Sequence, residues 1–217
     1  MTHAANNPFF GKFKTPFETP PFDKIKIEHY EPAFDEGIKQ MEKEVQEIAN
    51  NPQPATFENT VVALERSGKL LETVSYVFFN VLGAEANDEM MEISQRVSPK
   101  LSQTSNNIFL NEKLLARVKS IYDKKEQLNL STEDAKLLED LYESFKANGA
   151  TLNKDDKEKY RKLSMDLSML TLQFDQNALK DKNRFELLIT DENELSGLPE
   201  SARDAAAMLA KSKDKNG

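Results

Sequence analysis

The chain has no cysteine, no tryptophan and only two histidines among its 217 residues. The lack of cysteine excludes a disulfide framework, a thiolate zinc site and a cysteine nucleophile. The two histidines, His3 and His29, stand in no Gly-x-Ser-x-Gly or comparable setting that would activate a serine nucleophile. The seven glycines are scattered, so no glycine-rich phosphate loop is present.

The chain also lacks a long apolar run. No stretch approaches the ~18 apolar residues that a membrane-spanning helix requires, and residues 1–7 lack the basic start and apolar run of a signal peptide. The net charge is -8, which disfavours nucleic acid as a partner because phosphate binding needs clustered lysine and arginine. We therefore expect a cytoplasmic protein, unless a signal peptide has been removed, without a membrane or nucleic-acid partner.

Proline and phenylalanine are concentrated near the start. The first thirty-two residues hold five prolines with five phenylalanines between them. Because proline fixes φ and removes a hydrogen-bond donor, residues 1–29 are predicted to form an extended arm. Five phenylalanines are too apolar for a free tail, so we expect the arm to bury its rings against a larger body.

Residues 30–182 carry apolar residues at helical spacing and are predicted to form a helical domain. Asn51-Pro52-Gln53-Pro54 ends the first helix, Thr56 is a predicted N-cap, and Gly68 is a predicted helix end. Ser131 or Thr132 caps a later helix. Pro99 predicts a kink or a restart inside a helix that runs from about residue 88 to 107. The apolar stripes begin Phe34, Ile38, Met41, Val45, Ile48; then Leu70, Val74, Val77, Val81; then Met90, Ile93, Val97, Leu101; then Leu114, Leu115, Val118, Ile121; then Leu138, Leu141, Tyr142, Phe145.

The longest predicted helix opens at Asn153 and runs to about residue 182. Its apolar residues alternate three and four apart, as in the seam of a coiled coil: Tyr160, Leu163, Leu167, Leu170, Phe174. Such a length exceeds what a compact four-helix bundle needs, so we expect this helix to pack against a larger partner. Met165 and Met169 are interpreted as core residues that widen the stripe, with a peptide groove as the alternative.

Residues 183–217 are predicted to form a strand and a short helix. Phe185, Leu187 and Ile189 alternate within residues 184–190, which favours one short β-strand. A single strand needs a neighbour for its backbone, and no other segment nearby is a candidate. No fixed period runs through the chain, which excludes a repeat array. The predicted fold class is all-α, an antiparallel array of long helices.

Several polar groups were weighed as site residues and interpreted as structural. His29 has no second histidine in reach, so its ring is expected to cap or pack. Phe57-Glu58-Asn59-Thr60 is expected to begin a helix rather than to contact substrate. The acidic pairs Glu133-Asp134 and Asp155-Asp156 lie in predicted first turns, where negative charge complements the helix dipole.

Several short motifs together resemble one family, the zinc metallopeptidases that include peptidyl-dipeptidase, oligopeptidase A and thimet oligopeptidase, with the peptidyl-dipeptidase branch the most similar. They are spread over nearly the whole chain: Asn7-Pro8-Phe9-Phe10, His29-Tyr30-Glu31-Pro32-Ala33-Phe34, Asn51-Pro52, Thr56-Phe57-Glu58-Asn59-Thr60, Leu64-Glu65-Arg66-Ser67-Gly68, Phe174-Asp175-Gln176-Asn177-Ala178-Leu179 and Leu195-Ser196-Gly197-Leu198-Pro199. Each fragment is weak alone, but together they occur in family order and at family spacing.

The resemblance implies the amino-terminal third of a helical, two-lobed peptidase whose channel admits short peptides, from which dipeptides are released at the carboxyl end. The family holds one zinc ion with a His-Glu-x-x-His helix, in which two histidines one turn apart reach the metal and the glutamate activates water. That motif is absent here, so no catalytic, cofactor-binding or metal residue is expected in this chain, and zinc only in the full-length parent.

The expected partners are the missing catalytic lobe of the same polypeptide and, in the parent, short peptide substrates. Self-association of the chain through apolar faces is also expected. Alone, the chain is expected to have no enzymatic activity. The alternative is a self-contained helical protein-interaction module. A di-metal four-helix bundle is excluded because no Glu-x-x-His pair occurs.

Overall fold

The computed structural model describes residues 7–216, which form two compact units with the division between Leu172 and Gln173. Each unit is considered by itself. His3 lies outside the described residues. The three-part division expected from the sequence, into residues 1–29, 30–182 and 183–217, stays a prediction.

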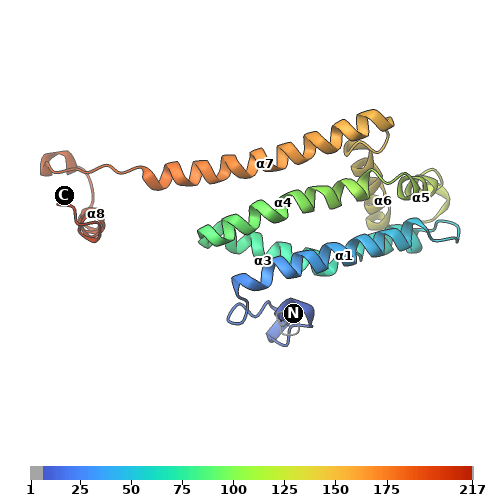
Figure 1. Ribbon diagram of the computed structural model, residues 1–217, viewed down its shortest axis with the longest axis horizontal. Helices are drawn as coiled ribbons and strands as arrows, with labels where there is room; N and C mark the ends of the chain where they lie inside the picture. The colour runs from blue at the N-terminus through green and yellow to red at the C-terminus, as the bar shows by residue number, and fades with distance from the viewer. Residues whose placement is uncertain (1–6, 217) are drawn as a thin grey trace. The chain divides into compact units, whose positions relative to one another are not determined.

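The first unit is an array of helices, and the prediction of an all-α chain is confirmed. The helices α1, α3 and α4 lie side by side, and α5 and α6 lie near one end of this layer (Figure 1). The elements are α1 (Tyr30–Ala49), the π-helical segment η5 (Phe57–Val62), α2 (Ala63–Glu65), α3 (Lys69–Glu85), α4 (Asp88–Phe109), α5 (Glu112–Tyr122), the 3-10 turn η6 (Lys125–Gln127), α6 (Thr132–Ala147) and the start of α7 (Lys154–Arg184).

Helix starts in this unit follow from capping side chains. Thr56 caps η5 as predicted, and of the two candidates for α6 it is Ser131 whose hydroxyl accepts the N–H of Asp134 at 3.1 Å. Asn87 and Asn111 cap α4 and α5 in the same way. These side chains satisfy amides that a helix leaves without partners in its first turn. The helix α4 continues through Pro99, so the predicted restart does not occur.

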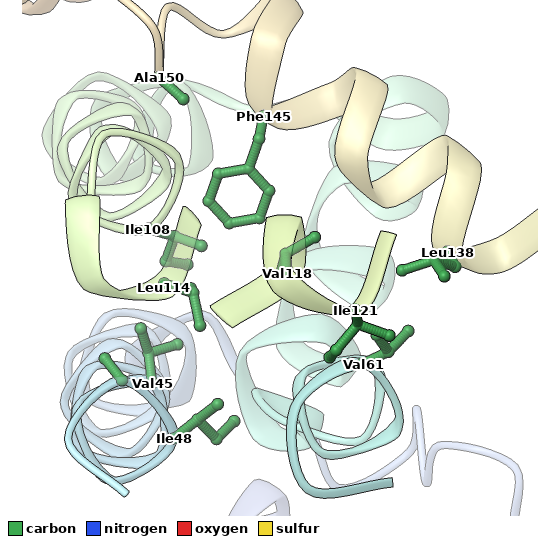
Figure 2. Close-up of a cluster of buried hydrophobic side chains, with 11 residues drawn as sticks. Val45, Ile48, Val61, Ile108, Leu114, Val118, Ile121, Leu138, Phe145 and Ala150 are labelled. Carbon is green, nitrogen blue, oxygen red and sulfur yellow. The ribbon is translucent and has the colours of Figure 1, made fainter. Parts of the chain in front are cut away.

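Two apolar cores hold the first unit together. One lies where α1, η5, α4, α5 and α6 meet, and Figure 2 shows its side chains converging from these helices. The other joins α1, α3 and α4 to the arm, and within it the rings of Phe34 and Phe78 meet edge to face at 5.4 Å. Gly37 lets α1 approach α3 closely, since a Cβ there would lie 2.9 Å from the Cα of Leu71.

The arm is only partly buried. It contains the short 3-10 turns η2 (Pro8–Phe10), η3 (Pro16–Glu18) and η4 (Ile27–His29). Phe9 enters the core and Phe13 packs against it, but Phe17 and Phe22 are exposed, against the prediction. The chain turns sharply at Phe17, whose φ is +58°, and a ring on this turn does not reach the helices.

The helix α7 faces the first unit with the opposite side from the one predicted. Up to Leu172 its contacts to the unit come from Lys157, Arg161 and Ser164. The predicted seam is instead exposed, with Leu163, Leu167 and Leu170 at 67%, 65% and 63%. Tyr160 is half-buried, Met165 is half-buried and Met169 is exposed, so the methionine pair is not a core feature. The polar side of the helix packs inward because α4 presents Asn106 and Asn107 to it.

The second unit contains the end of α7, the turn η7 (Glu192–Leu195) and α8 (Glu200–Ser212). The helix predicted after Pro199 is confirmed. The strand predicted at 184–190 is not: Arg184 ends α7, and residues 185–190 form no sheet within the described chain. Alternation alone makes no strand, because an extended backbone needs a neighbour to bond. Glu186 instead forms ion pairs with Lys213, at 2.6 Å, and Lys215.

Candidate functional site

His29 ends the turn η4 and stabilises the start of α1. Its Nδ1 accepts the backbone N–H of Lys26 at 3.0 Å, and its carbonyl oxygen accepts from Asn7 Nδ2 at 2.8 Å. The ring is largely buried, and Nε2 lies 4.0 Å from Glu28 Oε1. One ring nitrogen is therefore committed to the backbone, and the histidine acts as a cap.

The segment Thr56–Thr60 forms a reciprocal capping box at the start of η5. Thr56 Oγ1 accepts the N–H of Asn59 at 3.1 Å, and Asn59 Oδ1 accepts the N–H of Thr56 at 2.9 Å. Asn59 Nδ2 also donates to the carbonyl of Pro54 at 3.0 Å. Every polar group of Asn59 thus has a partner within the fold, which leaves none for a substrate.

Arg117 of α5 joins this box to the loop after α1. Its guanidinium donates to the carbonyls of Asn51 and Gln53, at 2.9 and 3.1 Å, and to Asn59 Oδ1 at 2.9 Å. Its Nε donates to Thr60 Oγ1 at 3.2 Å. Two of the sequence motifs, Asn51-Pro52 and Thr56–Thr60, are therefore two sides of one hydrogen-bonded junction.

Arg117 was missed in the sequence, although a signal for it existed. It stands three residues after Leu114 and next to Val118, inside the apolar stripe of its own helix. A charged residue at a core-facing position indicates a buried polar partner. The partners are backbone carbonyls and side chains more than fifty residues away in sequence, which no local pattern reveals.

The motif at residues 64–68 closes another turn. Gly68 has φ +71° and begins α3, and its N–H donates to Glu44 Oε2 at 2.7 Å. Only glycine adopts this backbone region freely. The carboxylate of Glu44 thus supplies from α1 the acceptor that the first turn of α3 lacks.

The acidic pairs lie in the first turns of helices, as expected. Glu133 and Asp134 begin α6, and Asp155 and Asp156 begin α7. Lys159 and Asn153 bond the carboxylate of Asp156, at 2.9 and 2.8 Å, and these bonds lower its pKa. A carboxylate that stays ionised in a helix cap is unsuited to act as a general acid.

The residues at hand do not fit zinc. Within residues 7–216 no three histidine, cysteine, aspartate or glutamate side chains gather where they could hold a metal ion. The described chain holds a single histidine, and one of its ring nitrogens already accepts a backbone hydrogen bond. A peptidase zinc site takes three protein ligands and keeps an open position for water.

The largest hollow of the first unit is a groove of about 1230 Å³ between the arm, α1 and α3. Its floor is apolar, with Phe13, Leu70 and Val77, and ion pairs line its rim. Glu36 bonds Gln40 at 2.9 Å and lies 3.6 Å from Lys39, which lowers its pKa. Without a histidine or a neutral carboxyl group, this groove is suited to hold chain rather than to catalyse.

No helix within residues 7–216 has the length and apolarity to cross a bilayer.

Comparison with known proteins found peptidases. The chain is 39% identical to a dipeptidyl carboxypeptidase of Escherichia coli over 207 residues, which are 95% of this chain and 30% of the relative. It is 36% identical to the dipeptidyl carboxypeptidase of Salmonella typhimurium over 96% of its length and 31% of the relative. It is 29% identical to oligopeptidase A of Escherichia coli, over 94% of the chain and 30% of the relative. No family model matches the chain.

The chain therefore spans about 30% of the length of the curated relatives it matches. The match runs through nearly all of this chain, so the motifs on which the resemblance rests lie within one continuous similarity. The prediction from those motifs is confirmed: the chain is a homologue of a region of the thimet-type peptidases represented by dipeptidyl carboxypeptidase and oligopeptidase A.

Proposed function

We propose that this chain is the amino-terminal, non-catalytic helical region of a zinc peptidase that hydrolyses short peptides. The parent would release dipeptides from the carboxyl end of its substrates, in the cytoplasm, by means of a zinc-activated water. The zinc and the catalytic groups would come from the part of the parent that this chain does not match. In the parent this region would form a wall of the substrate channel and restrict access to unfolded chains.

The extent of the match supports this proposal most strongly. Nearly the whole chain aligns with 30% of peptidases that act on peptide ends, as their names state. A region of that size leaves ample sequence in the relatives for a separate catalytic lobe. The polar groups of the motifs also support a structural role, because Asn59, His29 and Arg117 are all engaged within the fold.

The groove beside the arm supports a role in walling a channel. Its apolar floor and charged rim suit an extended chain better than a small polar metabolite. Rigid helices behind it, packed through Gly37 and the rings of Phe34 and Phe78, would keep such a wall in place.

A chimera tests the proposal. The matched 30% of the Escherichia coli dipeptidyl carboxypeptidase would be replaced by this chain, and release of dipeptides from a blocked tripeptide would be measured. We expect zinc-dependent activity from the chimera. The chain alone should bind less than a tenth of an equivalent of zinc by metal analysis and cleave nothing. Activity of the chain alone that a chelator abolishes would refute the proposal.

The second candidate is a self-contained helical interaction module. The exposed apolar residues of the first unit favour it, among them Phe17, Tyr76 and Leu167. The chimera separates the two functions, because a module with its own partner has no reason to complete a peptidase. A folded but inactive chimera would favour the module.

A further inference from the structure

The helix α7 presents its polar side to the first unit. Asn106 donates to Ser164 Oγ at 2.7 Å, Arg161 donates to Asn107 Oδ1 at 3.0 Å, and Lys157 forms an ion pair with Glu112 at 2.9 Å. A surface helix of a finished domain buries its apolar side and exposes its polar side. Residues 154–172 show the reverse.

The opposite side of this helix carries a stripe of three exposed leucines, Leu163, Leu167 and Leu170, named here the leucine stripe. Their spacing of four and then three residues is that of a coiled-coil seam, which accepts the side chains of another helix. Asp166 flanks the stripe and forms no ion pair within residues 7–216. A second helix with an aliphatic seam and a basic residue opposite Asp166 matches this surface.

Two properties of the chain disfavour a second copy as the occupant. Its net charge is -8, so two copies repel one another. Three leucines also cover far less than the ~800 Å² that each partner buries in a stable interface between separate proteins. A helix tethered in the same polypeptide needs no such area, because tethering raises its effective concentration.

We propose that the leucine stripe of α7 is the seat of an amphipathic helix from the part of the peptidase that this chain does not match. The helix α7 then lies between two layers, with polar contacts to its own unit and apolar contacts to the rest of the enzyme. This inference rests on the proposed function, since it takes the occupant from the parent protein. It adds the surface through which the two parts hold together.

Hydrogen exchange in the chimera tests this inference. Amides of residues 160–172 should exchange about tenfold more slowly in the chimera than in the chain alone, because a packed helix opens less often. The triple variant Leu163→Gln, Leu167→Gln, Leu170→Gln should restore the faster exchange. Glutamine has nearly the helix propensity of leucine, so the helix itself is preserved.

A matched control uses exposed residues on other sides of the same helix. Lys162→Gln with Met169→Gln should leave exchange in the chimera within about twofold of the parent chimera. In the chain alone, the triple variant should leave the thermal midpoint unchanged, because the three leucines are exposed there. A lowered midpoint would show that the stripe belongs to the chain's own packing and would overturn the inference.

The other outcomes separate the two proposals. An active chimera in which residues 160–172 exchange as fast as in the chain alone, or in which the triple variant changes nothing, overturns the inference and leaves the proposed function standing. A chimera without activity overturns the proposed function, and the inference with it.

Discussion

Asn106 of α4 and Ser164 of α7 are joined by a hydrogen bond of 2.7 Å from the amide to the hydroxyl. The serine hydroxyl donates in turn to the carbonyl of Arg161 at 3.0 Å. Asn106 is buried, so its amide has little access to water. This short polar chain holds α7 to the first unit at a position where an apolar contact would be usual.

Removing the hydroxyl should destabilise the first unit. Ser164→Ala leaves the buried amide of Asn106 without this acceptor, which we expect to lower the free energy of unfolding by about 1–2 kcal/mol. Urea unfolding followed by circular dichroism measures the change. Ser105→Ala, at an exposed position on α4, is the control for the better helix propensity of alanine. Equal effects of the two variants would show that the bond contributes nothing.

Arg117 should be the most sensitive polar position in the chain. Arg117→Ala removes four hydrogen bonds to Asn51, Gln53, Asn59 and Thr60 and leaves their acceptors poorly solvated. We expect a loss of about 2–4 kcal/mol in the free energy of unfolding, from chemical denaturation.

Two further variants separate geometry from charge at this junction. Arg117→Lys keeps the charge but not the planar fork, so it should recover less than half of the loss. Lys113→Ala, one turn earlier on α5, removes a single exposed bond to Asn50 and should cost under about 0.5 kcal/mol. Full recovery by lysine would contradict the geometric account.

Two helical glycines should respond to alanine with opposite signs. Gly37→Ala places a methyl 2.9 Å from the Cα of Leu71, so α1 and α3 must separate, at a cost of about 1–3 kcal/mol. Gly83 has open space around the same atom, so Gly83→Ala should stabilise the chain by about 0.5–1 kcal/mol. Thermal unfolding of the two variants measures both effects, and shifts of the same sign would refute the close approach of the two helices.

Glu186 should titrate well below an ordinary glutamate. Hydrogen bonds from Lys213 and Lys215 lower its pKa from 4.5 to about 2. Since the folded pKa lies below the unfolded one, the contribution of this group to stability is complete above pH 4.5 and is lost as the pH falls toward 2. Carbon-detected NMR titration of the carboxylate measures this value. In Lys213→Ala with Lys215→Ala the pKa should return close to 4.5, and an unchanged value would exclude the ion pairs as its cause.

The sequence by itself determined the helical class, most helix starts and the family. Capping residues such as Thr56 and Ser131 act on amides within three residues, and apolar stripes act within a few turns, so both are legible locally. The motif at residues 56–60 was also interpreted correctly as a helix start. The absence of His-Glu-x-x-His could be read directly, since the motif lies within a single helical turn.

Only the tertiary structure decided which side of a helix faces inward. The spacing of Leu163, Leu167 and Leu170 shows that they share a side of α7, but the neighbour that the helix meets determines whether this side is buried. Here Asn106 and Asn107 of α4 attract the polar side, and the leucines face outward. The same limit applies to Arg117 and to the unformed strand at 184–190. Each depends on partners distant in sequence, and hydrogen bonds across such distances leave no periodic pattern in the chain.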